Sequence, residues 1–210
     1  MDPKEYQRRF EVLFKRFNEA HLFFFTWRVL QKKEYEKYWK QESNFWNAVH
    51  ASLNQSWMMS LAKIYEKSSY SKEDTIISIY SLVKYQSDSE RKKEVESFLD
   101  ENKKVLNNIG IIRHHILAHT NAEHKLTRKE LFEKFPIKYG EIEKLFEKTE
   151  ELFHLLHHQS NHSLSMEGFH EECETDVESL MQKLEFFRKA EKKHFEKIKN
   201  GESYSDFPPE

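Results

Sequence analysis

The segment ESNFWNAVHASLNQSWMMSLAKIYEK, residues 42–67, decides the fold class. Residues three and four positions apart share one face of an α-helix. The large apolar residues of this segment follow that spacing, so it predicts an amphipathic helix over 42–67. They are Phe45, Val49, Leu53, Trp57, Leu61 and Ile64.

The chain on both sides of this segment carries the same helical spacing. Upstream, Tyr6, Phe10 and Phe17 belong to a pattern that predicts one long helix over residues 3–40. Downstream, Ser71 with Asp74 and Thr127 with Glu130 have the spacing of helix-capping pairs. The helices predicted there run over 72–85, from Asp88 or Ser89 to Leu117, from Thr127 to Pro136, over 139–158 and over 173–199.

The composition agrees with an all-α fold. Only 4 Gly and 4 Pro occur in 210 residues, far too few for the turns of a β-rich protein of this size. The 17 Phe, 9 Tyr and 4 Trp supply large rings for a helical core. We expect a helical bundle over residues 1–162, a loop and helix over 163–199 that pack on it, and a disordered tail over 200–210.

Charge and cysteine content limit the partners and the compartment. With a net charge of -2, the whole molecule does not attract nucleic acid, so any RNA contact must be local. The single Cys173 permits no internal disulfide, and its acidic neighbours should raise the pKa of the thiol. No signal peptide or membrane-spanning apolar run is found, which predicts a cytoplasmic protein with no membrane partner.

The stretch IIRHHILAHTNAEH, residues 111–124, is the one that suggests chemistry. Arg113, His114 and His119 crowd an apolar segment, whereas most other helices are flanked by Lys and Glu. RNA cleavage by its own 2′-hydroxyl needs proton transfer and a cation for the charged phosphorane. Histidine can act as acid or base near neutral pH, and arginine presents a bidentate fork to phosphate. This chemistry requires neither a metal nor another cofactor.

The spacing of the motif constrains its geometry. Six residues turn a helix through about 600°, a net 240°, so Arg113 and His119 do not share a face, whereas His115 and His119 do. Either the helix ends near Ala118 and lets His119 swing round, or two subunits assemble the site. A two-fold homodimer would bring two copies of the motif into one positive cleft.

This motif resembles the signature of HEPN domains (higher eukaryotes and prokaryotes nucleotide-binding), in which Arg, a polar residue, four residues and His follow one another. LAHTNAE around His119 and residues 57–83 are similar to the abortive-infection AbiU-type branch. The resemblance covers roughly residues 5–160. Lys63, Glu66 and Asn121 depart from it, since Arg, Asp and Asp are expected there.

The resemblance implies a HEPN-like helical bundle with an additional C-terminal helix, acting as a dimeric, metal-independent endoribonuclease. A toxin or phage-defence role, with RNA as substrate and an antitoxin protein as a possible partner, follows from it. His119 would be the general acid and base, Arg113 the phosphate clamp and His114 the orienting group. His115, Thr120 and Asn121 would contact the substrate.

Two other functions remain open at this point. The first is a non-catalytic interaction or RNA-binding module that partners a nucleotidyltransferase antitoxin, in which the Arg and His residues are structural. The second is a metal-binding bundle, because E-x-x-H pairs are the ligands of di-iron sites. These pairs are Glu151 with His154, Glu167 with His170, and Glu191 with His194, and two of them lie on a predicted solvated face or loop.

Overall fold

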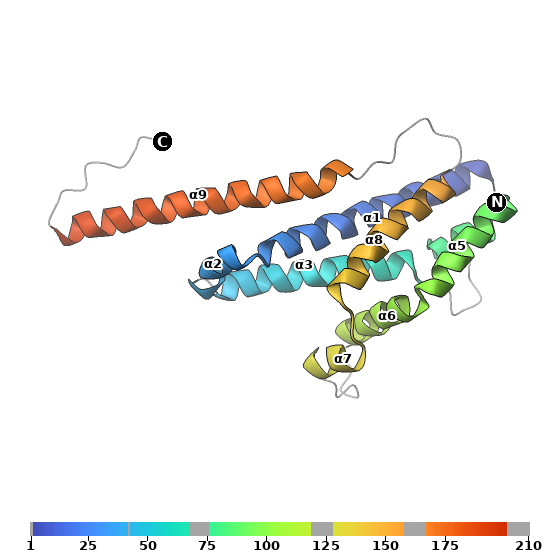
Figure 1. Ribbon diagram of the computed structural model, residues 1–210, viewed down its shortest axis with the longest axis horizontal. Helices are drawn as coiled ribbons and strands as arrows, with labels where there is room; N and C mark the ends of the chain where they lie inside the picture. Colours follow the sequence, from blue (N-terminus) through green and yellow to red (C-terminus); the bar gives the residue numbers. More distant parts are fainter. Residues whose placement is uncertain (1, 42, 68–75, 119–127, 158–166, 201–210) are drawn as a thin grey trace.

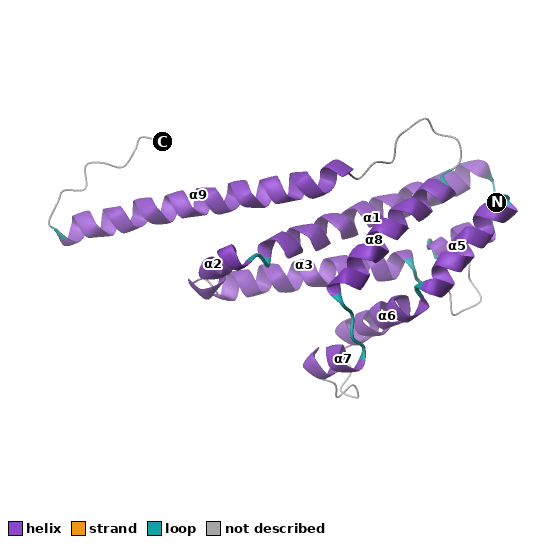
Figure 2. Ribbon diagram, viewed as in Figure 1, coloured by secondary structure: helices purple, strands orange, loops and turns teal. Residues whose placement is uncertain are grey.

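The computed structural model describes residues 2–41, 43–67, 76–118, 128–157 and 167–200, and every regular element in these ranges is helical (Figures 1 and 2). The all-α class is therefore confirmed. The helices are α1 (Pro3–Leu30), η1 (Lys33–Tyr35), α2 (Glu36–Gln41), α3 (Ser43–Ile64), α4 (Ile79–Lys84), α5 (Ser89–Glu101), α6 (Lys103–Ala118), α7 (Arg128–Lys134), α8 (Tyr139–Leu156) and α9 (Glu167–Lys199).

A ladder of phenylalanine rings joins α1 to α8. Seven residues are close to two helical turns, so residues at this spacing line one face. The ring centroid of Phe17 lies 5.2 Å from that of Phe153, and Phe24 stacks on Phe146 at 5.0 Å. The ladder consists of Phe10, Phe17 and Phe24 on α1 with Phe146 and Phe153 on α8, all at most 2% exposed.

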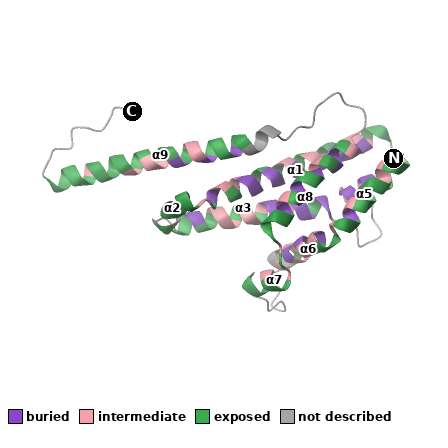
Figure 3. Ribbon diagram, viewed as in Figure 1, coloured by how far each residue is buried: buried purple, intermediate pink, exposed green. Residues whose placement is uncertain are grey.

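Helix α3 packs along α1 and is tied to α8 by one buried hydrogen bond (Figures 1 and 3). Trp57, Leu61 and Ile64 of α3 are buried in the same core as the ladder. Just past the end of α3, the hydroxyl of Tyr65 lies 2.5 Å from Oγ1 of Thr149 on α8. Burial raises the pKa of Tyr65 above its ordinary value, so the phenol stays neutral and the bond persists at physiological pH.

The prediction of one helix over residues 3–40 is wrong, because α1 ends at Leu30 and the chain turns. Lys32 is extended there, and its ammonium group binds Glu178 at 3.3 Å and also Glu174, both on α9. After the turn, the aromatic residues Tyr35 and Tyr38 pack against α9 in a second hydrophobic core. It consists of Leu30, Tyr35, Tyr38, Trp46, Val177 and Met181.

Three other predicted boundaries need correction. Residues 76–78 are not helical, and α4 begins only after Ser78, whose hydroxyl accepts from the backbone of Ser81; Ser71 and Asp74 lie outside the described residues. The helix that begins after Asp88 is two helices, because Asn102 ends α5 and donates a side-chain bond to the carbonyl of Phe98. Helix α9 begins at Glu167, six residues before the predicted start.

Two aromatic runs, FFFTW at residues 23–27 and NFW at residues 44–46, differ in burial. Phe24, Phe25 and Trp27 are buried as predicted. In NFW, Trp46 is buried while Phe45 is 61% exposed, because the second core lies on the Trp46 side of α3. The apolar stripe of α3 is therefore correct from Val49 onward and wrong at Phe45.

Helix α9 runs along α1 and then projects past α2 (Figure 1). Its inner part is anchored by Cys173, Val177 and Met181, which are buried. None of the helices in the described ranges is both long and apolar enough to cross a membrane. The predicted tail falls almost wholly on residues 201–210, which lie outside the described residues.

Shortening one ring of the ladder should lower the stability of the whole bundle. We expect Phe146→Ala to reduce the free energy of unfolding by about 3–5 kcal/mol, because it leaves a cavity in a packed core. Phe146→Leu should reduce it by less, because leucine leaves a smaller cavity than alanine does. Urea unfolding followed by far-UV circular dichroism measures this. The matched control is Phe186→Ala on the exposed side of α9, expected within about 0.5 kcal/mol of wild type. Equal losses at both positions would contradict this core assignment.

Candidate functional site

Helix α6 places the Arg-His motif at the edge of the core. Leu106, Ile109 and Ile112 lie three residues apart on this helix, and all three are buried in the main core. Each further residue turns the helix by about 100°, so the positions just after Ile112 emerge from the core. Arg113 is accordingly part-buried and His114 is exposed. The apolar spacing of α6 thus determines where its cationic side chains lie.

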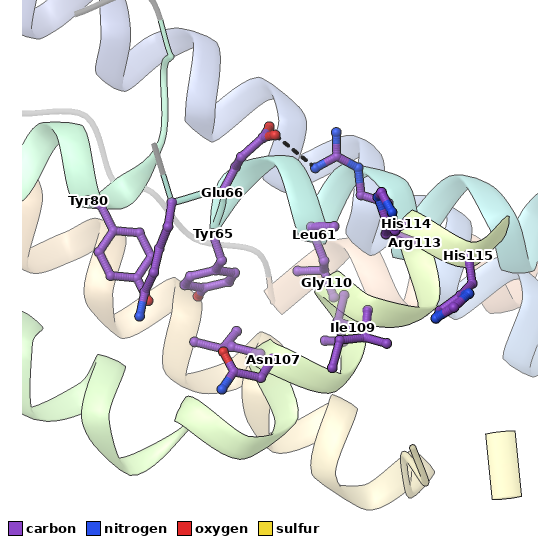
Figure 4. Close-up of a pocket in the computed structure, with 14 residues that line it drawn as sticks. Leu61, Tyr65, Glu66, Tyr80, Asn107, Ile109, Gly110, Arg113, His114 and His115 are labelled. Carbon is purple, nitrogen blue, oxygen red and sulfur yellow. Dashed lines mark ion pairs between the residues drawn. The ribbon is translucent and has the colours of Figure 1, made fainter. Parts of the chain in front are cut away.

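A pocket of about 520 Å³ lies between α6, the end of α3 and α4 (Figure 4). Three of the predicted site residues, Arg113, His114 and His115, contribute to its wall. The remaining residues of the lining are Leu61, Ala62, Tyr65, Glu66, Lys67, Tyr80, Leu106, Asn107, Ile109, Gly110 and Ile111. The pocket therefore joins segments that are about 40 residues apart in the sequence.

Arg113 is held by an ion pair across the mouth of this pocket. Its Nη1 lies 3.2 Å from Oε1 of Glu66, which follows α3. The side chain of Arg113 is 23% exposed and that of Glu66 is 36% exposed, so solvent still reaches both groups. A partly exposed pair of this kind contributes at most about 1 kcal/mol, which an incoming phosphate can replace. Glu66 thus orients the guanidinium of Arg113 and leaves it able to bind a phosphate.

The two neighbouring histidines differ in their position relative to Arg113. All three side chains line the pocket, and in Figure 4 His115 lies farther from Arg113 than His114 does. The ring centroids of His114 and His115 are 6.1 Å apart. Arg113 and His114 are therefore the pair that one small anion could contact together.

The far side of the pocket adds a second cation and aromatic rings. The ammonium group of Lys67 lies 5.0 Å from the centroid of the Tyr80 ring, a cation–π distance. Tyr65, tied to Thr149, closes the same side. Gly110, also in the lining, leaves open space, since a Cβ built there would meet nothing within 4 Å. The arrangement can hold a phosphate group next to an apolar or aromatic surface.

Three predicted site residues cannot be placed. His119, Thr120 and Asn121 lie outside the described residues. Helix α6 is described as far as Ala118, so neither of the two geometries expected for the motif is tested. The structure therefore brings Arg113, His114 and His115 to one pocket and leaves the general acid and base as a prediction.

The sequence did not predict that Glu66, Lys67 and Tyr80 would be part of the site. The only signal was Glu66, which departs from the family pattern, but nothing in the sequence indicated that its partner is Arg113. The single helix predicted from residue 88 or 89 to 117 would have carried Arg91, Lys92 and Lys93 on the same axis as Arg113, but the break at Asn102 separates them.

Other chemically active groups lie elsewhere. Within the described ranges, no three His, Cys, Asp or Glu side chains lie close enough together to hold a metal ion. Glu191 is exposed, as predicted for a solvated face, and Glu151 is exposed as well, whereas Glu167 and Gly168 are helical and not in the predicted loop. Burial, more than the nearby Asp176 and Glu172, raises the pKa of the Cys173 thiol, which confirms the predicted direction.

Comparison with known proteins identifies a family for the chain. The family model HEPN_AbiU2, described as AbiU2, matches residues 3–180 of the chain, which is most of its length. The matched region contains every residue of the pocket. No curated protein and no solved structure matches the chain.

Removing the carboxylate of Glu66 should free Arg113 for anions. We expect Glu66→Gln to bind inorganic phosphate about two- to fivefold more tightly, because a weak competing ion pair is lost. Isothermal calorimetry measures the affinity, and urea unfolding should change by less than about 1 kcal/mol. Glu133→Gln on α7, which pairs with Lys129 at the surface, is the matched control. Unchanged phosphate affinity in Glu66→Gln would contradict the role of the pair.

Proposed function

Since this chain belongs to the AbiU2 family of HEPN proteins, we propose that it is a metal-independent endoribonuclease that acts as a toxin or phage-defence effector. The observation that carries this proposal is the pocket that Arg113 and His114 both line, with the guanidinium oriented but accessible. Arginine and histidine are the two side chains that RNA transesterification needs when no metal is used.

In the proposed reaction, the 2′-oxygen of the RNA attacks the adjacent phosphorus and the bond from phosphorus to the 5′-oxygen breaks. His119 takes the 2′-hydroxyl proton and a proton is returned to the departing 5′-oxygen. Arg113 binds two phosphate oxygens and stabilises the additional charge of the phosphorane. His114 orients the phosphate beside the guanidinium. The products are a 2′,3′-cyclic phosphate and a 5′-hydroxyl.

The local charge of the pocket supports an anionic substrate. Among the described lining residues, Arg113 and Lys67 are basic side chains and Glu66 is the one carboxylate. A phosphate that replaces Glu66 at Arg113 would meet a second cation at Lys67. The near-zero charge of the whole chain is therefore no obstacle to binding RNA at this place.

Two substitutions test the mechanism. His119→Ala should slow cleavage of RNA by about 10²- to 10⁴-fold, because proton transfer is lost. Arg113→Lys should also lose activity although it keeps the positive charge, since a point charge cannot reproduce the planar fork of the guanidinium. The assay follows a labelled RNA in EDTA, where wild type should still cut and leave a cyclic phosphate; DNA, which lacks the 2′-hydroxyl, should survive.

Two controls separate chemistry from folding. Each variant must keep the circular dichroism of wild type. Gly110→Phe should block cleavage by filling the pocket, while Gly110→Ala, whose Cβ meets open space, should not. Cleavage abolished by EDTA, or unaffected by His119→Ala, would overturn the proposal and favour the interaction module or the metal-binding bundle.

We further propose that the active form is a two-fold homodimer in which Arg113 of one subunit works with His119 of the other. This proposal rests on the six-residue separation of the two side chains along the chain. A mixture of inactive Arg113→Lys and His119→Ala subunits then contains hybrid dimers with one intact site. Equal mixing should restore about a quarter of the wild-type rate, the random share of intact sites. No recovery, although hybrid dimers form, would place each site within one subunit.

A further inference from the structure

The outer end of α9 differs from its inner part in charge. Residues 167–178 contain six Asp or Glu and no Lys or Arg. Residues 186–199, here named the arm, contain six Lys or Arg and two Glu, a net charge of +4. The arm projects beyond α2 and is largely exposed (Figures 1 and 3). It also lies after residue 180, where the family match ends.

Aromatic rings are exposed along the arm. Phe186, Phe187 and Phe195 are 69%, 66% and 56% exposed. Phenylalanines that remain so exposed on a soluble protein mark a surface that meets a partner. Lysines and arginine lie between these rings in the sequence FFRKAEKKHFEKIK, residues 186–199. Aromatic rings interleaved with cations are the surface that single-stranded nucleic acid recognises by stacking and phosphate contact.

One face of the arm lines a hollow. Arg188, Lys192, Phe195 and Lys199 follow the spacing 4, 3 and 4, which places them on one helical face. All four line an open hollow of about 720 Å³, whose described lining holds five cations, with Lys37 of α2 among them, and the three carboxylates Glu185, Glu191 and Glu196. Neither Lys192 nor Lys199 forms an ion pair with another described residue. The face therefore offers a ring flanked by cations in a concave setting.

The base of the arm is rigidly anchored. Glu185 accepts from Lys37 at 2.6 Å and from the hydroxyl of Tyr38 at 2.5 Å, and these bonds lower the pKa of Glu185 to about 2. The guanidinium carbon of Arg188 lies 4.6 Å from the centroid of the Tyr38 ring. These contacts fix the end of the hollow nearest α2, so less ordering is needed there when a ligand binds.

A second copy of the chain fits this surface poorly. Two arms side by side would place like charges together, which is destabilising. The acidic part of α9 has its apolar side chains Cys173, Val177 and Met181 buried in the body, so they are not available to a partner's arm.

A membrane fits poorly as well. Phe187, Phe195 and Ile198 lie within about 80° of one another around the helix, but the carboxylate of Glu191 lies between them and Phe186 lies about 180° from Phe195. A helix that lies on a bilayer instead gathers its apolar residues on one face. Rings on several sides of a cationic helix suit a strand whose bases can stack at separate points.

We infer that the arm, with its hollow beside α2, is a binding site for single-stranded RNA, separate from the pocket at Arg113. Lys192 and Lys199 contact phosphates, and Phe195 stacks on a base. The site adds affinity for long strands and has no part in the chemical step.

The test measures binding without cleavage, on the full chain. The probe is a fluorescently labelled 2′-O-methyl oligouridine of about 20 nucleotides, long enough for one such site. It lacks the attacking hydroxyl, so its binding does not depend on whether the chain cuts RNA. The readout is fluorescence anisotropy at several salt concentrations.

The charge variant is the double substitution Lys192→Glu with Lys199→Glu. We expect at least tenfold weaker binding at low salt. The slope of log affinity against log salt concentration should fall by about 1.4, from two lost phosphate contacts on a single strand. Lys144→Glu with Lys148→Glu, on exposed positions of α8, is the matched control and should retain most of the binding.

A substitution at Phe195 measures the contribution of the aromatic ring to binding separately from that of the lysine charges. Phe195→Leu should weaken binding about 5- to 150-fold, as expected for one lost base stack, whereas Phe195→Trp should retain it. Unchanged affinity in both the charge variant and Phe195→Leu would overturn the inference. An arm variant that shifts the oligomeric state by light scattering, or wild type that binds anionic lipid vesicles more tightly than RNA, would also overturn it.

Failure here and failure of the proposed function are distinguishable. Loss of binding in the arm variants, with no cleavage by wild type, would support the arm and overturn the endoribonuclease. Cleavage by wild type, with equal binding by the arm variants, would do the reverse.

Discussion

The phenylalanine ladder between α1 and α8 is the interaction on which the remaining structure depends. Its rings come from helices more than 100 residues apart in the chain, so they close the bundle across its whole length. Thr149 lies between the two ladder positions of α8 and binds Tyr65 at the end of α3. Tyr65 also lines the pocket, and Glu66 is the next residue in the chain. The phenylalanine packing therefore sets the position of Glu66 relative to α6.

The pairing of Arg113 with Glu66 has two physical consequences. A buried guanidinium without a partner would be costly, and the carboxylate removes that cost while it fixes the direction of the side chain. The same carboxylate must give way when a phosphate arrives, so part of the binding energy is offset. Because both groups keep contact with water, the exchange is small in free energy. Glu66 can therefore orient the guanidinium of Arg113 and still leave it available to a phosphate.

A net charge of -2 conceals a strong separation of charge in this chain. The acidic part of α9 lies on the body, where Glu174 and Glu178 bind Lys32, and the basic part projects from it. Average charge therefore says little about which ligands a long helical protein can bind, because a projecting helix presents its own local potential. The pocket of α6 and the arm of α9 are two such local cationic surfaces.

The sequence alone determined the helical class, most helix positions and the presence of the Arg-His motif, because these follow from spacing along one helix. It could not determine the turn at Lys32, the break at Asn102 or the exposure of Phe45 beside a buried Trp46, since each depends on which distant surface the helix meets. The partner of Arg113 was likewise decided only by tertiary structure. Glu66 reaches it because α3 and α6 pack together, and local periodicity carries no information about such a contact.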